Sequence, residues 1–435
     1  MPAFIVVWLG QAISLLGTGM SGFGLTIWAY EVTGKATALA LVGFFFILPM
    51  VVFSPIAGAI VDRSNRKLMM MISDLAAGAT TIAVLALYAT GQLQIWHLCV
   101  SSFITGTFQT FQWPAYSAAI TLMLRKEQYG RANGMIELAG ASSGIFAPLM
   151  AGALLGVIGI SGLLIIDIVT FVVAVSALLF VHVPQPARSE AGEKAQGSIW
   201  KESVYGFRHI FARPSLLGLQ IVFLLGNLFS TVGYTVMAPM ILARTGNDAV
   251  IFGAAQTAGA IGGVIGGVVM SAWGGFKNRV HGVLSGWGLT SLLGQTLMGL
   301  GRALPVWAAA NFLGAFFGPI INGSNQAIWM AKVEPDVQGR VFATRRLIAW
   351  LVSPIATLVA GPLADYVFEP AMREGGQLTG AFGWLVGTGP GAGMSLMILL
   401  TGLAAALVGF GAYGVRAVRD AERLLPDHDA VVATS

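Results

Sequence analysis

The chain has 435 residues, of which 56% are hydrophobic and only 10% are charged, and its formal net charge is +5. A soluble protein has about 25% charged residues, so this composition excludes a globular protein with a surface in water. The net positive charge does not indicate a nucleic-acid partner, because the basic residues lie in short loops between apolar runs. The single cysteine, Cys99, excludes a disulfide framework and a cysteine metal cluster, and we expect no metal or cofactor.

Apolar stretches of about 20 residues, the length of a membrane-crossing helix, predict an all-α integral membrane protein. We expect twelve transmembrane helices, at residues 4–29, 38–61, 68–90, 95–122, 132–157, 161–183, 215–242, 249–273, 281–301, 304–330, 341–366 and 391–415. The N-terminal "MPAFIVVWLGQ" has no basic region or cleavage site, so we interpret it as part of the first span.

A polar stretch interrupts this pattern after the sixth predicted span. The expected organisation is an N-terminal six-helix bundle (1–183), a cytoplasmic linker (184–213), a C-terminal six-helix bundle (214–415) and a cytoplasmic tail (416–435). Helical spacing in the linker favours an amphipathic helix on the inner leaflet, formed by Trp200, Val204, Phe207 and Phe211. A flexible linker fits residues 184–198 better.

The basic residues predict the orientation. If both termini are cytoplasmic, all but four of the 24 Lys and Arg residues lie on the cytoplasmic side. The positive-inside rule then supports the twelve spans and places both termini in the cytoplasm. We therefore expect the protein in the plasma membrane, which is the inner membrane in a bacterium.

The two halves resemble each other at a spacing of 209 residues, without a gap. Gly130-Arg131 matches Gly339-Arg340 at this spacing, and Gly58 matches Gly267. Such a duplicated six-helix unit is typical of transporters that work by alternating access, with the substrate site between the halves near the bilayer midplane.

The stretch "GAIVDRSNRK" at 58–67 resembles the loop between the second and third spans in the major facilitator superfamily, with Asn65 in place of the usual second glycine. The residues in register are Gly58, Asp62, Arg63, Arg66 and Lys67. The fifth span resembles the glycine-rich motif of the antiporters of that superfamily, at Gly134, Ser143, Ala147, Pro148, Ala151 and Gly152. Residues 337–370 look like the eleventh span of its macrolide-efflux and siderophore-exporter branch.

The resemblance implies a major facilitator fold of two pseudo-symmetric six-helix bundles and a conformational latch. Gly58 would allow the second and eleventh spans to touch, and Asp62 would face the helix N-terminus near Gly339 and Arg340. The basic residues of the loop would anchor to neighbouring acids or to lipid headgroups. For Arg63 and Lys67, ordinary positive-inside charge is an equally good explanation. In the second half Ser271 takes the position of the aspartate, which predicts an asymmetric latch.

Acids inside predicted spans are candidates for proton coupling, because a charge at the bilayer centre costs about 2.5–3.5 kcal/mol. Asp167 is the first choice, followed by Glu137, Asp74 and Asp365. The alternatives are a hydrogen-bonded helix contact for Asp167, and pairing with loop arginines for Asp74 and Glu137.

Polar and aromatic residues in repeat-related stretches of the fourth and tenth spans are candidates for a substrate cavity. These are Gln109, Gln112, Trp113, Tyr116, Asn322, Asn325, Gln326 and Trp329, which Gln11, Asn227 and Tyr234 could join. Such residues suit a bulky amphipathic solute, although each alone is better explained as a hydrogen-bonding contact between helices.

The sequence therefore predicts a secondary transporter that exports a hydrophobic or amphipathic small molecule in exchange for protons. Its expected partners are that substrate, protons and membrane lipids, and we expect a monomer. An importer or a lipid flippase on the same fold is the alternative. A membrane-embedded enzyme or sensor is disfavoured, because the sequence has no convergent catalytic set and no phosphate-binding loop for ATP.

Overall fold

The computed structural model describes residues 2–124, 129–181, 206–333 and 338–427, and these residues form helices and no strands. The first helices are α1 (Pro2–Thr33), α2 (Ala36–Arg63), α3 (Arg66–Ala89), α4 (Ile95–Met123) and α5 (Tyr129–Phe180). The next are α8 (Pro214–Thr245), α9 (Ala249–Trp273), α10 (Arg279–Leu289), the π-helix η2 (Thr290–Thr296), α11 (Leu297–Leu300), α12 (Leu304–Phe316) and α13 (Gly318–Lys332).

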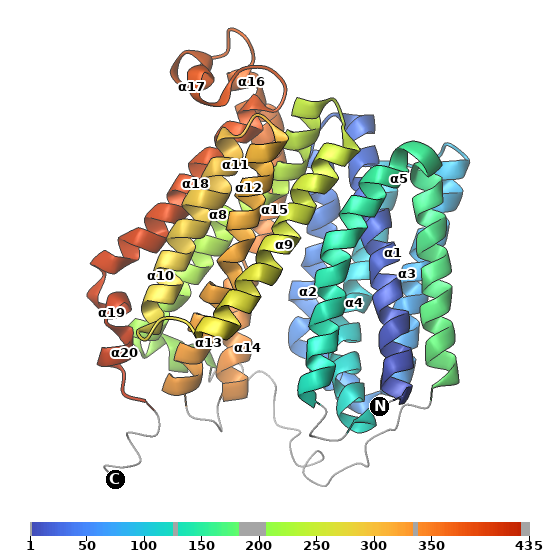
Figure 1. The fold of residues 1–435 in the computed structure, drawn as a ribbon, viewed down its shortest axis with the longest axis horizontal. Helices are drawn as coiled ribbons and strands as arrows, with labels where there is room; N and C mark the ends of the chain where they lie inside the picture. The colour runs from blue at the N-terminus through green and yellow to red at the C-terminus, as the bar shows by residue number, and fades with distance from the viewer. Residues whose placement is uncertain (1, 125–128, 182–205, 334–337, 428–435) are drawn as a thin grey trace. The chain divides into compact units, whose positions relative to one another are not determined.

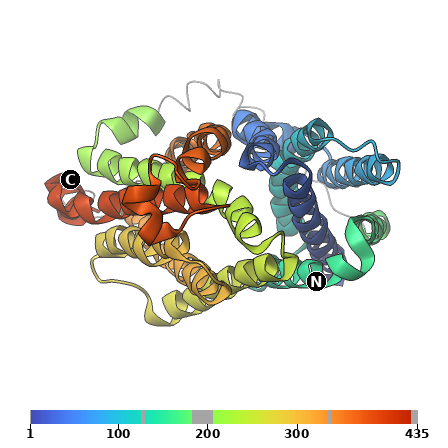
Figure 2. The ribbon, with the colours of Figure 1, turned by 90° about the horizontal axis from the view of Figure 1, so that it is seen from above.

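The remaining elements begin after residue 337. They are α14 (Gln338–Trp350), α15 (Ser353–Leu363), the π-helix η3 (Ala364–Phe368), α16 (Glu369–Met372), α17 (Thr379–Val386), α18 (Ala392–Gly411), the 3₁₀ turn η4 (Ala412–Gly414), α19 (Arg416–Arg419) and α20 (Ala421–Leu424). Viewed from above, many of the helices are seen close to end-on (Figure 2). The architecture is therefore the all-helical one that the sequence predicts.

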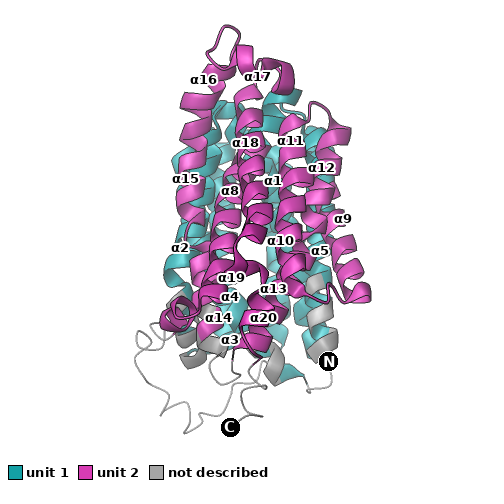
Figure 3. Cartoon of the chain, turned by 90° about the vertical axis from the view of Figure 1, so that its left-hand side faces the viewer, with its two compact units in different colours: residues 1–187, 238–257 teal, residues 188–237, 258–435 magenta. Residues whose placement is uncertain are grey.

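The chain forms two compact units (Figure 3). Unit 1 contains residues 1–187 together with 238–257, and unit 2 contains residues 188–237 and 258–435. The end of α8 and the start of α9 therefore pack with the first five helices. The domain limits expected from the sequence group this segment with the second half, and they stay a prediction.

α5 consists of two antiparallel arms rather than one straight helix (Figure 1). The chain turns at Gly159, whose backbone has φ 64° and ψ −175°. A positive φ is accessible to glycine without the steric cost that a Cβ atom adds. This turn confirms the predicted division between the spans at 132–157 and 161–183. The first arm is defined here as residues 129–158 and the second arm as residues 160–180.

Nine stretches of the described residues are long and apolar enough to cross a membrane. They are Pro2–Thr33, Ala36–Ser54, Arg66–Ala89, Leu138–Phe180, Pro214–Thr245, Ala249–Trp273, Leu304–Lys332, Thr344–Met372 and Ala392–Gly414. Leu138–Phe180 includes both arms of α5. The predicted span at 281–301 is divided by η2 into shorter helices, and α4 is not among the nine. The count of twelve spans thus stays a prediction.

A stripe of small residues lets α1 lie close to the second arm of α5. A Cβ atom on Gly17 would be 3.1 Å from Asp167 Cα, and one on Gly24 would be 2.8 Å from Leu163 Cδ1. Close backbone approach through small residues is how membrane helices pack without a hydrophobic driving force. This packing brings the hydroxyl side chains of α1 within reach of Asp167.

Two connections between helices are ordered in part, and the sequence predicted helical structure in the first of them. Residues 206–211 of the linker are helical, and the rings of Phe207 and Phe211 stack with centroids 6.4 Å apart. Trp200 and Val204, the other residues of the predicted amphipathic helix, lie outside the described residues. Before α18, the Glu369 carboxylate accepts the main-chain N–H of Met394 at 2.8 Å and caps that helix.

Candidate functional site

Asp167 lies on the second arm of α5, where its side chain is 4% exposed. Its Oδ1 accepts a hydrogen bond from Thr18 Oγ1 at 3.0 Å. Its Oδ2 accepts bonds from Ser21 Oγ at 2.8 Å and from Thr81 Oγ1 at 3.0 Å. Within the described residues, these three hydroxyl groups are its side-chain partners, and it forms no ion pair. A buried carboxylate is thus held by neutral groups from α1 and α3 alone.

Asp74, on α3, is held by amides instead of hydroxyls. Its Oδ2 accepts from Gln11 Nε2 at 2.8 Å and its Oδ1 accepts from Gln112 Nε2 at 2.5 Å. The two amides also contact each other, Gln112 Nε2 to Gln11 Oε1, at 3.3 Å. Among the described residues, the side-chain partners of Asp74 come from α1 and α4, and its pairing with loop arginines stays a prediction.

The structure says less about the surroundings of the other two candidate acids. Glu137 lies on the first arm of α5, and its side chain lies outside the described part of the structure. Asp365 lies in η3, where it is partly buried. Among the four acids, Asp167 and Asp74 are those whose surroundings can be compared.

The polar residues of α4 divide between packed and exposed positions. Gln112 binds Asp74, whereas Gln109 is exposed. Trp113 is 52% exposed and meets Tyr116 edge-on, with ring centroids 6.5 Å apart. The Tyr116 hydroxyl is buried and has no hydrogen-bond partner among the described residues. The exposed side chains and the unpaired hydroxyl are therefore available to contact a ligand, whereas Gln112 is already hydrogen-bonded to Asp74.

The corresponding residues of the second half also divide. Asn322 is exposed, and Tyr234 on α8 is 69% exposed. Asn325 accepts the indole N–H of Trp329 at 3.0 Å, and both side chains are buried. Asn227 Nδ2 donates to the main-chain carbonyl of Ala349 at 3.1 Å, a contact between helices. Their role as a shared substrate cavity stays a prediction.

Sequence reasoning missed Arg345 on α14, which it assigned to a cytoplasmic segment. Its Nη2 donates to Gln326 Oε1 at 2.6 Å. Its guanidinium carbon lies 5.3 Å from the ring centroid of Trp329 and 5.1 Å from that of Phe342. These are cation–π distances. The signal available in the sequence was an Arg-Arg pair inside a predicted span.

The structure describes only part of the loop between α2 and α3, where the latch is predicted. Gly58, Asp62 and Arg63 lie in the last turns of α2, and Gly339 and Arg340 lie in the first turn of α14. The side chains of these residues are outside the described set, so the latch stays a prediction. Asn65 caps α3, because its Oδ1 accepts the N–H of Leu68 at 3.1 Å, and Arg66 is the first residue of that helix.

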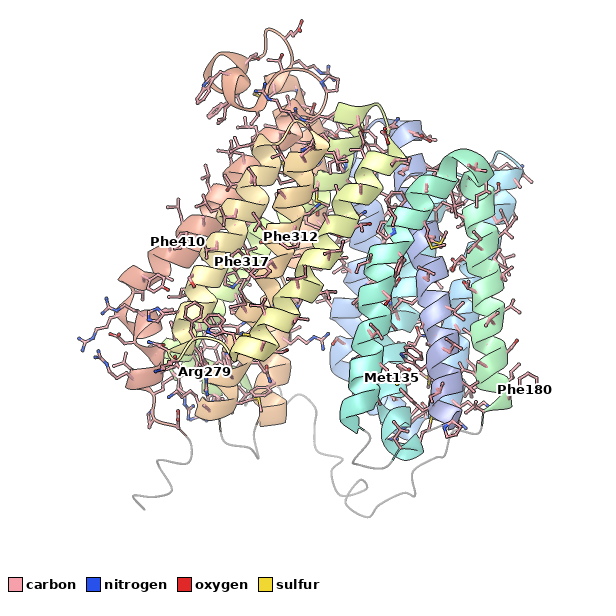
Figure 4. The ribbon with its side chains drawn as sticks, in the orientation of Figure 1. Met135, Phe180, Arg279, Phe312, Phe317 and Phe410 are labelled. Carbon is pink, nitrogen blue, oxygen red and sulfur yellow. The ribbon has the colours of Figure 1, made fainter. Side chains whose placement is uncertain are left out.

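Lys67 contacts main-chain carbonyl groups among the described residues, rather than the acid or lipid headgroup that the resemblance implied. Its Nζ donates to the carbonyl of Leu179 at 3.0 Å and to that of Val181 at 2.8 Å, just around Phe180 at the end of α5 (Figure 4). The last carbonyls of a helix lack partners within it, and they attract a cation. Lys67 therefore ties the start of α3 to the end of α5.

The loop before α10 is the counterpart in the second half. Asn278 caps α10 through its Oδ1, and Arg279 is the first residue of that helix (Figure 4). Matching these residues to Asn65 and Arg66 requires a spacing four residues longer than the 209 between Gly130 and Gly339. The gap-free repeat is therefore wrong at this loop, and the pairing of Gly58 with Gly267 does not hold.

A carboxylate reaches this loop from the C-terminal region. Glu422 Oε2 accepts the N–H of Val280 at 3.0 Å, at the start of α10. Lys332, at the end of α13, donates to the Glu422 carbonyl at 2.8 Å and pairs with Asp427 at 2.6 Å. The loop of the second half lacks its own acid, as expected, but Glu422 supplies one from outside the loop.

The antiporter-like motif forms a packing face on the first arm of α5. Ser143 donates to the Leu15 carbonyl of α1 at 3.0 Å. A Cβ atom on Gly152 would lie 2.8 Å from the Ala249 carbonyl oxygen at the start of α9. The small residues of the motif thus allow two neighbouring segments of unit 1 to approach closely. The remaining members of the motif are Gly134, Ala147, Pro148 and Ala151.

A pocket of 310 Å³ lies beside this face, within unit 1. Its lining comes from α1, the first arm of α5 and the start of α9, and it includes Phe23, Thr26, Ser143, Pro148 and Gln256. The ring of Phe23 stacks on that of Phe252 with centroids 5.0 Å apart. The pocket lining thus includes an aromatic ring, hydroxyl groups and an amide.

Comparisons with known proteins agree with this architecture. The family model described as Major Facilitator Superfamily matches residues 7–357. Macrolide efflux protein A of Streptococcus pyogenes is 25% identical over 375 residues, which cover 84% of this chain and 90% of that protein. Multidrug efflux pump Tap of Mycolicibacterium fortuitum is 26% identical over 367 residues, 80% of this chain and 87% of that protein.

Solved structures show the same fold at low identity. A bacterial homologue of the human lysosomal transporter Spinster, in an inward-facing and unoccupied conformation, matches with a TM-score of 0.66 at 15% identity over 97% of this chain and 98% of that chain. A mutant of the nucleoside transporter NupG also gives a TM-score of 0.66, at 12% identity over 95% and 99% of the two chains. These likenesses concern the fold alone.

Proposed function

Because the chain belongs to the Major Facilitator Superfamily, we propose that it is a proton-coupled exporter of a hydrophobic or amphipathic small molecule, working by alternating access. It is an integral membrane transporter, and its relatives include proteins named for macrolide and multidrug efflux. The substrate belongs, in this proposal, to the class of drugs, macrolides or siderophore-like molecules.

The observation that carries the proton coupling is the Asp167 carboxylate. It is buried in a predicted membrane span and bonded only to hydroxyl groups among the described residues. A charge at the centre of a membrane-spanning helix costs about 2.5–3.5 kcal/mol on insertion scales. A proton that neutralises Asp167 therefore changes the energy of unit 1 by an amount that can bias a conformational equilibrium.

The driving force would come from proton entry. Moving one elementary charge across a membrane potential supplies about 2.3 kcal/mol per 100 mV, to which any pH gradient adds. Export of one substrate for one or more protons is consistent with this energy. In this proposal Glu137 and Asp365 could carry further protons, whereas Asp74 is held by two amide donors.

We infer that the substrate contacts exposed polar and aromatic groups rather than the packed ones. Trp113 and Tyr234 are largely exposed, and Gln109 and Asn322 are exposed amides. Their combination of apolar area and hydrogen-bonding groups suits an amphipathic solute. In this proposal Gln11 and Gln112 serve instead as contacts between helices, and Asn325 and Trp329 bond to each other within α13.

We also propose that Asp62 latches the cytoplasmic gate, together with Gly58, Arg63, Arg66, Gly339 and Arg340. In this proposal both termini lie in the cytoplasm and the protein is a monomer in the bacterial inner membrane. The distribution of Lys and Arg supports the orientation.

A growth-inhibition panel tests the function. A deletion strain and an overexpressing strain are compared on macrolides, cationic dyes and siderophore analogues, with and without a protonophore. We expect overexpression to raise tolerance to at least one compound, and the protonophore to abolish the gain. Unchanged tolerance together with altered lipid asymmetry would instead identify a flippase, and a gain that survives the protonophore would contradict proton coupling.

A further inference from the structure

We propose that Ser21 and Thr81 act as a hydroxyl switch, which lets Asp167 bind and release a proton while every buried polar group keeps a hydrogen-bond partner. This inference rests on the proposed proton coupling and assigns two positioning residues to it.

Each of the two hydroxyls has two acceptors within reach. Ser21 Oγ lies 2.8 Å from Asp167 Oδ2 and 3.1 Å from the carbonyl oxygen of Thr18, in its own helix. Thr81 Oγ1 lies 3.0 Å from the same Oδ2 and 3.2 Å from the carbonyl oxygen of Ala77, also in its own helix. A hydroxyl has one proton, so it donates to one of these acceptors at a time.

The two charge states of Asp167 use these acceptors differently. When the carboxylate is ionised, Ser21 and Thr81 both donate to Oδ2. When a proton binds Oδ2, the new O–H donates to one of the two hydroxyl oxygens, and that hydroxyl turns its own proton to the backbone carbonyl. The step needs rotation of a C–O bond and no change in the positions of the heavy atoms.

Thr18 completes the site from the other side of the carboxyl group. Its Oγ1 donates to Oδ1 at 3.0 Å. This bond is compatible with both charge states, because Oδ1 remains an acceptor when the proton is on Oδ2. Thr18 is exposed, whereas Ser21 and Asp167 are buried. In this proposal Oδ2, which the buried Ser21 contacts, is the proton-binding atom.

Asp74 is also buried, but its hydrogen-bond partners cannot change from donating to accepting. Its partners are the N–H₂ groups of Gln11 and Gln112, which donate and do not accept. A proton on Asp74 would face these donors unless a whole amide flipped, and the flip would disturb the contact between the two amides. Either outcome leaves a buried polar group without a partner, which is unfavourable.

Among the described residues of the helices packed against α5, no charged side chain bonds to the Asp167 carboxylate. The charged groups on those helices are Glu31 on α1 and Arg66, Lys67 and Asp74 on α3, and the remaining titratable groups are Tyr30, Tyr88, His97, Cys99 and Tyr116. Asp74 is about two helical turns from Thr81 along α3. The hydroxyl groups therefore set the local chemistry of Asp167.

Infrared difference spectroscopy tests the switch without a substrate. The full-length protein is reconstituted in lipid, and the acid-minus-neutral spectrum is recorded. We expect a carbonyl stretch from a protonated carboxyl group that disappears in Asp167→Asn. In a double variant, Ser21→Ala with Thr81→Val, this band should move to higher frequency, because the carboxylic O–H has lost both acceptors.

Four variants control for disturbed folding. Each single variant keeps one hydroxyl and should leave the band in place. Thr81→Ser in the Ser21→Ala background restores a hydroxyl and should restore the band position. Thr80→Val removes a neighbouring hydroxyl that bonds Ala77 and Thr105 instead of Asp167, and it should change nothing.

A transport measurement separates this inference from the proposed function. Proteoliposomes loaded with a radiolabelled macrolide are assayed for macrolide-dependent proton movement, which we expect to be lost in the double variant and kept in Thr80→Val. Normal proton movement and an unmoved band in the double variant would overturn the switch while leaving proton coupling intact. Macrolide efflux without proton movement in the unaltered protein would instead overturn the proposed coupling.

Discussion

The two units hold different charged side chains among their described helices. Unit 1 contains the buried carboxylates of Asp74 and Asp167, both bonded to neutral side chains. Unit 2 contains Arg345 against two aromatic rings and Lys332 at the end of α13. A carboxylate can be neutralised by a proton, whereas an arginine stays charged in proteins. Under the proposed coupling, the proton-binding acid belongs to unit 1, and Arg345 of unit 2 keeps its positive charge.

A second contrast lies within unit 1. Asp167 is surrounded by hydroxyls, which both donate and accept, and Asp74 by amide N–H groups, which only donate. The same residue type is therefore suited to proton exchange at one position and to holding helices together at the other.

Replacing Asp167 should have the largest effect, because it removes the charge that distinguishes unit 1. We expect Asp167→Asn to lower proton-coupled efflux by about a hundredfold, since a buried charge is worth about 2.5–3.5 kcal/mol and each 1.4 kcal/mol is about a factor of ten. Vesicle acidification in proteoliposomes measures this. Unchanged acidification in a folded variant would make Asp167 a purely structural residue.

Asp62→Asn tests whether the two units are latched asymmetrically. A carboxylate at a helix N-terminus contributes up to about 2 kcal/mol, which corresponds to about a thirtyfold change in an equilibrium. We therefore expect normal expression with transport largely lost, measured as substrate counterflow in proteoliposomes. Normal counterflow in this variant would rule out the latch.

Arg345→Met tests the fixed charge of unit 2. The change leaves Gln326 Oε1 without its donor at 2.6 Å and should destabilise the protein by about 1–3 kcal/mol. The dependence of efflux on the proton gradient should remain, because Arg345 does not exchange protons. Thermal unfolding and a protonophore titration measure the two effects, with Arg345→Lys as the matched variant that keeps the charge and loses the planar stacking. Loss of proton dependence in Arg345→Met would break the division between the units.

Gln112→Leu sharpens the contrast between the two acids of unit 1. It removes one of the two amide donors to Asp74, so we expect a lower unfolding temperature and intact proton coupling. The expected cost is about 1–3 kcal/mol. Gln109→Leu, at an exposed amide on the same helix, is the matched control for stability, and it should leave the unfolding temperature unchanged. A coupling defect specific to Gln112→Leu would assign proton chemistry to Asp74 as well.

We expect the smallest effect from removing two contacts, one in each unit, that join the start of a helix to another segment of the same unit. Lys67 performs this in unit 1 through carbonyl groups, and Glu422 in unit 2 through a main-chain N–H. Lys67→Met and Glu422→Gln should each cost about 0.3–1 kcal/mol, the usual value of a charge at a helix end. Paired unfolding curves in detergent measure this. A loss of transport in either variant at normal stability would give these ties a role beyond packing.

Much of the fold was predictable because the signals are local. Apolar length and the turn before residue 161 follow from the sequence alone, and Gly159 confirms the turn. The choice of Asp167 as the first acid followed from its apolar neighbours along the chain. The match of Asp62 with Ser271 was wrong. At this loop the spacing between the two halves is four residues longer than 209, and an alignment without gaps does not include that difference.

The sequence by itself determined that the chain is a helical membrane protein, where its charges lie along the chain and which acids are embedded, because hydrophobicity and charge are properties of local segments. Only the tertiary structure decided which groups meet. Ser21 and Thr18 are 146 and 149 residues from Asp167 in the chain, and Glu422 is 142 residues from Val280. The close approach of α1 at Gly17 brings the hydroxyls to Asp167, and hydrogen bonds act only at contact distance. That is why the hydroxyl partners of an acid found from the sequence could be named only in the folded chain.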